Sequence, residues 1–339
     1  MTPKLSRRAV AGGALFAPFL ATRARAAVPG IRVGWATMPG HMIPVLFTKP
    51  DILRHYGKTY TVTPINFRGS SPQMTAMAAG EVDLAAYSPL TLALSALNAH
   101  LDVRAVADII QDGVPGYHTE TYLVRADSGI DAVPQMKGKR AATNAIGSAS
   151  DTAMRAMLKR AGLVDRQDYV TVQAAFPSMP ALLEQKKVDL SVILLPELLP
   201  MLASGQYRPL FTARDAWGPT ELVFLAGRGE FLDKNQAAMT DFMEDWVRAM
   251  QWFQAPPNRA EAIGIIADFM KVPAKSLDYL FTQQDYYRDP WSRVNAPGIQ
   301  RAIDAAQTLG LIPAALPVAP KYVEYRFTDE AETRIKSAA

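Results

Sequence analysis

Small hydroxyl residues stand where predicted strands give way to predicted helices. Ser70 and Ser71 follow a β-branched run, Ser88 follows a second apolar run, and Gly147-Ser148 precedes an amphipathic stretch. A helix N-terminus has unpaired backbone N–H groups and partial positive charge, so it can hold a negative ligand group without a basic side chain. Each Ser-Pro step is also an ordinary helix start. The repetition in two parts of the chain favours a site for a small anion.

Motifs of common catalytic and metal sites are missing. The four histidines form no His-x-x-x-His pair, and the sequence contains neither a phosphate-binding loop with its lysine nor Gly-x-Ser-x-Gly. Carboxylate pairs such as Glu81/Asp83 and Asp285/Asp289 are interpreted as solvated faces rather than as acid–base pairs. Cysteine is absent, which excludes disulfides, thiolate metal ligands, cysteine nucleophiles and a lipoprotein anchor. The sequence therefore predicts a protein that is not an enzyme and carries no metal and no cofactor.

Short apolar runs alternate with amphipathic stretches, which predicts an α/β protein whose strand–helix units form mostly parallel sheets. One series of units lies before about residue 100 and a second begins near Thr121; long helices follow from Phe231. We expect strands at 31–35, 60–67 (an edge strand because of Pro64), 82–86, 122–124, 139–143, 169–174 and 188–194. We expect helices at 43–56, 72–80, 90–99, 150–161, 179–185, 234–253 and 259–270. Two such series predict two lobes.

The first 26 residues are typical of an export signal. Lys4, Arg7 and Arg8 precede a Gly/Ala-rich apolar stretch, and Ala24-Arg25-Ala26 is a small-x-small cleavage site. Ser6-Arg7-Arg8 resembles the twin-arginine signal. Gly12-Gly13 and Pro18 disfavour the alternative of a folded amphipathic helix. We therefore expect a periplasmic protein, exported by the twin-arginine route.

The charge of the chain depends on that segment. The full sequence of 339 residues carries a net charge of +4, but five of its 36 basic residues lie in the first 26 positions, which contain no acidic residue. After cleavage, 31 basic side chains face 32 acidic ones and the net charge is −1. The basic balance therefore gives no support to nucleic-acid binding. With 49% hydrophobic and 20% charged residues, the chain is long enough to bury two cores without disulfides.

Three segments carry a resemblance to periplasmic substrate-binding proteins of nitrate/sulfonate/taurine-type ABC importers. The first is residues 67–83, in which a Ser/Gly turn precedes Ala78-Ala79-Gly80 and Asp83. The second runs from Lys137-Gly138-Lys139-Arg140 through Gly147-Ser148 to Leu163, and the third from Leu182 to Asp189. The likeness spans nearly the whole chain after the signal. It implies an α/β, two-lobed type II periplasmic binding protein, with a ligand cleft between the lobes and C-terminal helices.

The resemblance also implies domains, site residues and partners. Lobe 1 would comprise residues 27–116 and 216–339, and lobe 2 residues 117–215, with hinge closure over the ligand. A monomer would deliver a small anionic ligand to an ABC permease and its ATPase. Ser70 and Ser148 would contact the ligand from opposing lobes, while Ser71 would cap the helix. The implied ligand-binding residues are Trp35, Thr37, His41, Ser70, Tyr87, Ser88, Gly147, Ser148, Leu195 and Trp217.

One departure from the family pattern bears on the ligand. Many members have Trp-Glu-Pro where this chain has Leu194-Leu195-Pro196. The loss of a stacking ring and of a carboxylate disfavours taurine and favours a sulfonate or carboxylate with an aromatic or alkyl body. Whether Glu197 or His118 reaches the cleft, and whether the protein serves transport or sensing, stays open at this stage. The alternative function is an enzyme on the same fold, a pyrimidine-precursor synthase or desulfinase, which the absence of cysteine disfavours.

Overall fold

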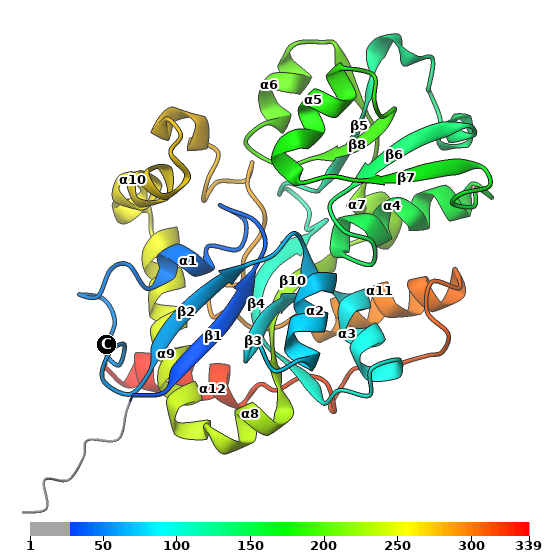
Figure 1. Cartoon of the computed structure of the whole chain (residues 1–339). Coiled ribbons are helices and arrows are strands. Elements are labelled where there is room, and N and C mark those ends of the chain that lie inside the picture. Colours follow the sequence, from blue (N-terminus) through cyan, green and yellow to red (C-terminus); the bar gives the residue numbers. More distant parts are fainter. Residues whose placement is uncertain (1–27, 339) are drawn as a thin grey trace, which may run out of the picture.

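The computed structural model describes residues 28–338. These residues form two separate five-stranded sheets with helices around each of them, so the predicted α/β class is confirmed (Figure 1). The part of the molecule that contains the first sheet is called lobe 1 here, and the part that contains the second is lobe 2. The predicted signal peptide, residues 1–26, lies outside the described residues.

The sheet of lobe 1 has the strand order β2-β1-β3-β10-β4. β1 pairs in parallel with β2 and β3, whereas β10 runs antiparallel to both β3 and β4. β2, which contains Pro64, is an edge strand as predicted. The strands are β1 (Gly30–Trp35), β2 (Thr61–Asn66), β3 (Leu84–Tyr87), β4 (Val103–Asp112) and β10 (Thr220–Arg228).

The sheet of lobe 2 has the order β7-β6-β8-β5-β9 and repeats the same pattern. β6 pairs in parallel with β7 and β8, and β5 runs antiparallel to β8 and β9. The strands are β5 (Thr121–Arg125), β6 (Lys139–Thr143), β7 (Tyr169–Gln173), β8 (Leu190–Ile193) and β9 (Tyr207–Thr212). Both sheets are therefore mixed, and the expectation of mostly parallel sheets was wrong. In each lobe the antiparallel strand between two neighbours is the one by which the chain arrives from the other lobe.

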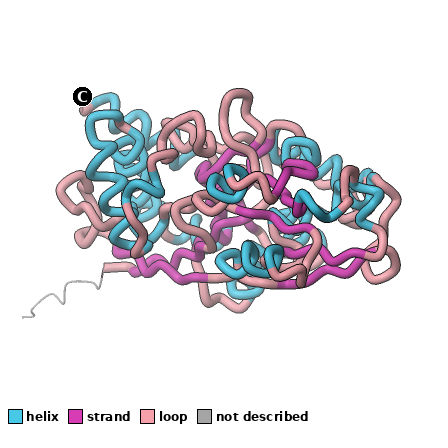
Figure 2. Tube along the Cα trace, turned by 90° about the horizontal axis from the view of Figure 1, so that it is seen from above, coloured by secondary structure: helices cyan, strands magenta, loops and turns pink. Residues whose placement is uncertain are grey.

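Helices cover both sides of the sheets (Figures 1 and 2). In lobe 1, α2, α3 and α11 lie on one side of the sheet, and α1, α9 and α12 lie on the other (Figure 1). The helices of this lobe are α1 (Ile43–Leu46), α2 (Ser70–Ala78), α3 (Pro89–Leu97), α8 (Gly229–Lys234), α9 (Gln236–Gln254), α10 (Arg259–Met270), α11 (Ala296–Thr308) and α12 (Arg326–Ser337). Those of lobe 2 are α4 (Ala149–Arg160), α5 (Met179–Glu184), α6 (Leu198–Ala203) and α7 (Ala213–Trp217). No helix within residues 28–338 is long and apolar enough to span a bilayer.

The predicted helix at 43–56 is wrong beyond Leu46. α1 has only four residues, and the chain then continues through turns. Three consecutive backbone N–H groups, those of Arg54, His55 and Tyr56, donate to the buried Asp245 carboxylate of α9 at 2.7–2.9 Å. A carboxylate that accepts three N–H groups replaces the bonds that a helix would have made there. These hydrogen bonds attach residues 54–56 to α9 of lobe 1.

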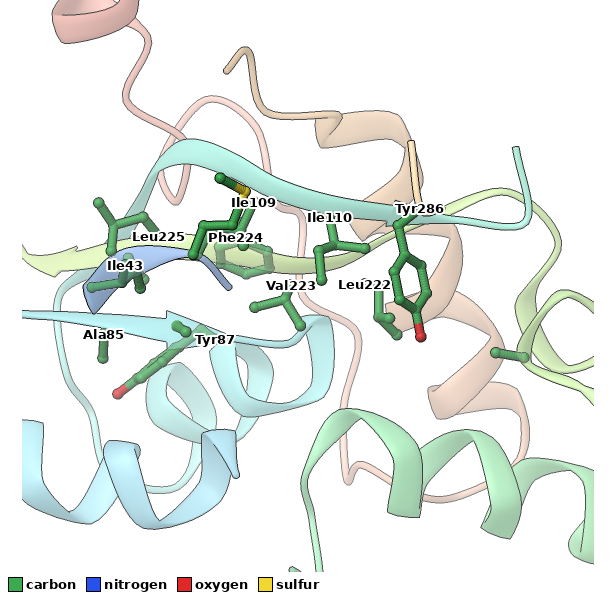
Figure 3. Packing of buried hydrophobic residues seen from close by; sticks show 14 of the residues in the cluster. Ile43, Ala85, Tyr87, Ile109, Ile110, Leu222, Val223, Phe224, Leu225 and Tyr286 are labelled. Carbon is green, nitrogen blue, oxygen red and sulfur yellow. The ribbon is translucent and has the colours of Figure 1, made fainter. Parts of the chain in front are cut away.

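The core of lobe 1 is centred on β4 and β10. Figure 3 shows Ile109 and Ile110 of β4 packed beside Leu222 to Leu225 of β10, with Tyr286 near Ile110 and Leu222. β4 was not predicted as a strand, although it has ten residues. Its buried residues do not alternate with exposed ones, since both faces are covered. Tyr286 belongs to the irregular segment 278–295, which in this way reaches the edge of the core.

Two connections join the lobes. Residues 113–120 lead from β4 to β5, and residues 218–219 lead from α7 back to β10. They touch each other, because a Cβ added to Gly113 would lie 2.9 Å from the carbonyl oxygen of Gly218. We propose lobe boundaries at 116/117 and 215/216, because the strands of one sheet lie outside this interval and those of the other lie inside it; the second boundary falls within α7, most of which belongs to lobe 2.

Candidate functional site

Two adjoining cavities lie between the lobes. The inner cavity, of about 50 Å³, is lined by residues of both lobes and of the late segment that contains Tyr279 and Tyr286. The outer cavity, of about 370 Å³, continues toward the surface. The two share the lining residues Ala36, Thr37, Met38, Phe176, Leu194 and Leu195. A ligand could therefore occupy both cavities at once.

The structure brings six of the ten predicted site residues to these cavities. Thr37, His41, Ser70, Ser148 and Leu195 line the inner one. Trp35 lines the outer one, together with Thr37 and Leu195. Ser70 begins α2 in lobe 1, and Ser148 is the N-cap residue of α4 in lobe 2. Their opposed placement follows from the strand-to-helix turns that the sequence indicated.

The other four predicted residues line neither cavity. Tyr87 is fully buried, and its hydroxyl lies 3.3 Å from the Met77 sulfur and points away from Tyr286 (Figure 3). Gly147 donates its N–H to Asp151. Trp217 and Ser88 line a separate small void of about 10 Å³ behind α3. Among the alternatives left open by sequence, Glu197 lines the outer cavity, whereas His118 lines neither.

A chain of hydroxyl groups supports Ser70 from behind. Thr91 donates to the Ser70 oxygen at 2.9 Å, and Ser70 donates to Ser88 at 3.3 Å. Ser88 also caps α3 by accepting from the Thr91 N–H. Ser88 is therefore a helix cap, as its position before Pro89 indicates. Its hydroxyl does not line the inner cavity but bonds to Ser70, which does.

Hydrogen bonds connect the two lobes directly beside the cavities. The Ser71 hydroxyl donates to the Ile146 carbonyl oxygen at 2.7 Å, and the Ser71 N–H donates to the Ser148 hydroxyl at 3.1 Å. The Asn144 amide donates to the Arg68 carbonyl oxygen at 2.8 Å. Ser71 does not cap α2, contrary to expectation, because the helix begins at Ser70, two residues before the expected start, with Gly69 as its N-cap residue. The Ser71 side chain instead forms hydrogen bonds from lobe 1 to lobe 2.

His41 presents a neutral imidazole to the inner cavity. Its Nδ1 accepts the backbone N–H of Ala36 at 3.2 Å. Burial, and secondarily the nearby Arg288 charge, lower the His41 pKa to about 3. A neutral ring that accepts at Nδ1 carries its proton on Nε2. His41 is therefore a hydrogen-bond donor to the cavity across the physiological pH range.

Glu120 is a buried carboxyl group in the wall of the inner cavity. The Ser150 hydroxyl of α4 donates to its Oε1 at 2.7 Å, and the Tyr122 hydroxyl lies 3.4 Å from its Oε2. Burial, reinforced by Asp112, raises the Glu120 pKa to about 8. Asp112 ends β4 and accepts the N–H of Glu120 at 2.7 Å. Glu120 is therefore part of the lining of the inner cavity and also the last residue of the first connection between the lobes.

The late segment 278–295 supplies three further groups to the inner cavity: Tyr279, Asp285 and Tyr286. Asp285 is buried but paired with Arg288 at 2.7 Å, and it accepts the backbone N–H groups of Phe281 and Tyr286. The Tyr279 side chain is buried, and its hydroxyl has no hydrogen-bond partner within residues 28–338. A buried hydroxyl without a partner costs about 1–3 kcal/mol, so this group is suited to a bound ligand.

Sequence reasoning missed Glu120, Tyr279 and Tyr286, and its interpretation of Asp285 as part of a solvated face was wrong, because Asp285 is buried beside the inner cavity. Glu120 stands next to a predicted strand in a segment that joins the lobes, and the other three lie in an irregular segment more than 150 residues later. No local pattern indicates that such a segment returns to the cleft. The one available signal was the family's cleft between the lobes, which connecting segments must border.

The outer cavity has mostly apolar and aromatic walls. Trp35, Phe67, Phe176 and Met270 are among its lining residues, and the exposed Phe269 packs edge-on against Trp35. Arg68 is the one basic side chain in the described lining of either cavity, and Glu197 is the acidic one in the outer. Within the described part of the chain, no group of three or more His, Asp or Glu side chains is arranged to hold a metal ion.

The family model of NMT1/THI5-like proteins matches residues 63–260, which is more than half of the chain. The chain belongs to the NMT1/THI5-like family. Solved structures with the same fold include the alkanesulfonate-binding protein SsuA from Xanthomonas axonopodis pv. citri bound to MOPS, at 19% identity and a TM-score of 0.66, covering 87% of this chain and 98% of that one. The nitrate-binding protein NrtA from Synechocystis PCC 6803 has 15% identity and a TM-score of 0.71, covering 91% and 90%.

The aliphatic sulphonate-binding protein SsuA from Escherichia coli is similar over 87% of this NMT1/THI5-like chain and 92% of its own, with 22% identity and a TM-score of 0.63. These likenesses confirm the predicted fold, a two-lobed type II periplasmic binding protein, and the predicted resemblance to sulfonate- and nitrate-type binding proteins. No functionally curated protein matches the chain in sequence.

Proposed function

We propose that this protein is a periplasmic solute-binding protein that captures a small organic anion between its lobes and delivers it to the permease and ATPase of an ABC importer. One observation carries the proposal. Polar groups from both lobes converge on the inner cavity, among them Ser70, Ser148 and the unpartnered Tyr279 hydroxyl. A buried polar cavity of this kind between two lobes is suited to enclosing a small molecule.

The two cavities support a ligand with an apolar body and one negative group. The aromatic and aliphatic walls of the outer cavity fit an aryl or alkyl body. Arg68, in the same wall, supplies positive charge for a sulfonate or carboxylate. The side chains at the Leu194-Leu195-Pro196 turn are apolar and border both cavities, as expected from the loss of the family's Trp-Glu.

Export and partners complete the proposal. The N-terminal 26 residues support export to the periplasm by the twin-arginine route, and the fold shared with periplasmic sulfonate-binding proteins supports delivery to a permease. We propose that the protein acts as a monomer.

An enzyme on the same fold is the second candidate. The observation that favours it is Glu120, a carboxyl group with a pKa of about 8 inside a secluded cavity, as a general acid would be. Its described partners are Ser150, Tyr122 and Asp112, which include neither a nucleophile paired with a base nor a metal ligand set. Chemical conversion of a bound compound by the purified protein would establish the enzyme instead.

The experiment is a thermal-shift screen of the purified protein against alkyl and aryl sulfonates, aromatic carboxylates, nitrate, bicarbonate and pyrimidines. We expect stabilisation by at least one organic anion, and calorimetry should then show weaker binding to the double variant Ser70→Ala/Ser148→Ala. The exposed Ser276→Ala serves as the matched control. Stabilisation by none of the anions would contradict the proposed function.

A further inference from the structure

The end of the site opposite Arg68 has a different chemistry. The inner cavity contains no lysine or arginine in its described lining, but it contains two carboxyl groups, Glu120 and Asp285. In the part of the chain that the structure describes, the positive charge paired with them is that of Arg288, which lies 2.7 Å from Asp285 and also donates to the Gly40 carbonyl oxygen. A second negative group on the ligand would therefore lie in a buried site whose described lining offers it no unpaired positive charge, which is costly.

The hydroxyl groups in the same wall are largely committed to other residues. Ser70 bonds to Ser88 and Thr91, Ser148 bonds to Ser71, and Ser150 donates to Glu120. These bonds fix the side chains of the cavity wall, but they use the hydroxyl hydrogens that could otherwise be donated to an anion. Ser70 and Ser148 can still accept a hydrogen bond from a ligand, but within residues 28–338 three other lining groups keep the most hydrogen-bonding capacity: the Nε2–H of His41, the hydroxyl of Tyr279, and the free lone pairs of Glu120.

The donors and acceptors of His41, Tyr279 and Glu120 determine which hydrogen bonds a ligand in the inner cavity must make. His41, with Nδ1 occupied, donates only. Tyr279 is only 3% exposed and has an unpartnered hydroxyl, which can donate or accept. Glu120, only 4% exposed, accepts from Ser150 at one oxygen at 2.7 Å. The Tyr122 hydroxyl lies 3.4 Å from the other oxygen but donates at 2.6 Å to the Ser150 carbonyl oxygen, so the Glu120 carboxyl retains acceptor capacity. A partner must accept from His41 and donate to Glu120.

We infer that the inner cavity binds a neutral N–H-bearing head group of the ligand, of the carboxamide or amino-heteroaromatic type, with Glu120 as the specificity-determining acceptor. An ammonium group would satisfy Glu120 but oppose the His41 Nε2–H. A carboxylate would accept from His41 but has no N–H to donate to the acceptor oxygen of Glu120. A neutral amide-like group offers both an N–H and a lone pair, so it meets all three wall groups. The inference rests on the proposed function, in which Arg68 holds the acidic end of the same ligand.

The charges around Glu120 agree with a neutral head group. Asp112 on β4, Tyr122 on β5 and Tyr286 lie in its surroundings, and within residues 28–338 no basic side chain is bonded to its carboxyl group. Burial raises the Glu120 pKa to about 8, so the group is mainly a neutral acid near pH 7. A neutral acid and an amide form two complementary hydrogen bonds, and an ionised Glu120 still accepts the amide N–H. Glu120 therefore binds the amide group at pH values both below and above its pKa.

The test uses two pairs of acids that differ only in replacing an amide NH₂ by CH₃. The aliphatic pair is succinamate and 4-oxopentanoate, and the aromatic pair is 4-carbamoylbenzoate and 4-acetylbenzoate. Binding to the purified protein is measured by calorimetry. We expect the amide member of at least one pair to bind roughly tenfold or more tightly, since a site built around a ligand N–H strongly rejects an analogue without it.

The variant Glu120→Met removes the acceptor at similar side-chain length, and we expect it to abolish the preference for the amide. The matched control is Glu230→Met on exposed α8, which should keep the preference. Equal binding of both members, or tighter binding of the ketone, overturns the inference and leaves the proposed function standing, and this result is read from the unmodified protein even if Glu120→Met does not fold. Binding of none of the four acids overturns the inference, while the wider anion screen decides the proposed function separately.

Discussion

The Ser71 hydroxyl of α2 donates to the Ile146 carbonyl oxygen of lobe 2 at 2.7 Å, directly beside the cavities. Ser71 was expected to cap its own helix, and instead it connects the two lobes. The bond forms only when the lobes approach each other, so it contributes to the free energy of closure.

Removal of this connection should weaken ligand binding without destabilising either lobe. Ser71→Ala loses the bonds to Ile146 and to the Ser148 hydroxyl, each with a net contribution of about 0.5–1.5 kcal/mol. Because closure and ligand binding are coupled, we expect affinity to fall by roughly 5- to 150-fold while the unfolding midpoint of the free protein changes little. Calorimetry and thermal unfolding measure the two quantities. An unchanged affinity would show that Ser71 has no role in closure.

Gly69 is required for space rather than for backbone conformation. Its φ of 174° is extended backbone, which any residue adopts. A Cβ at this position would overlap the Asn144 amide nitrogen and lie 2.5 Å from the Ser148 hydroxyl oxygen. Gly69→Ala should therefore hold the lobes apart, raising the radius of gyration in small-angle scattering and lowering affinity at least tenfold.

The control for this substitution is Gly264→Ala on α10, where an added Cβ meets no atom within 4 Å. It should leave both the radius of gyration and the affinity unchanged. If Gly69→Ala closes over ligand as the unmodified protein does, the close approach of Gly69 to lobe 2 is not needed for binding.

Tyr279 should show opposite effects on stability and on binding. Tyr279→Phe removes a buried hydroxyl that has no partner within residues 28–338. The relief of an unsatisfied group predicts a free protein that is as stable as the original or more stable, by up to about 1–3 kcal/mol. The loss of a ligand contact predicts weaker binding in the same variant. Chemical unfolding and calorimetry test both, and a purely structural Tyr279 would show reduced stability with unchanged affinity.

Glu120 should make the free protein less stable as pH rises. The native group keeps its proton up to its pKa of about 8, whereas an unfolded glutamate releases it near 4.5. Between these values the native state binds more protons, so the free energy of unfolding falls with increasing pH. Asp112, with a pKa of about 6, acts in the same direction at lower pH, and His41 acts in the opposite direction below 6.5.

The window from pH 6.5 to 8 therefore isolates Glu120 from Asp112 and His41. Thermal unfolding across this window should show a smaller decline for Glu120→Gln than for the unmodified protein, with the exposed Glu230→Gln as an unchanged control. Equal slopes in the unmodified protein and Glu120→Gln would mean that Glu120 is ionised in the native state.

Much of the fold could be predicted because strands and helices leave local patterns. β1, β6 and α4 lie within a residue of their expected positions, since apolar alternation and terminal glycines indicated them. β4 was missed because both of its faces are buried, and the helix at 43–56 failed because Asp245, almost 200 residues away, binds its backbone. The mixed order of the sheets follows from the crossing of the chain between lobes, which no local pattern encodes.

Some residues of the site could likewise be predicted from local sequence patterns, and others could not. Ser70 and Ser148 could be predicted because each starts a helix after a strand, and helix starts are visible in sequence. Glu120 and Tyr279 could not, because their position depends on how a connecting segment and a late irregular segment pack against the cleft. The groups that distinguish one ligand from another thus come from tertiary packing.

The most direct test of the proposed function is calorimetric titration of the purified protein with the organic anions that stabilise it, repeated with Gly69→Ala. We predict saturable binding of one molecule per chain, at least tenfold weaker in Gly69→Ala and equal to the original in Gly264→Ala. Absence of binding, or chemical conversion of the added compound, would contradict the account.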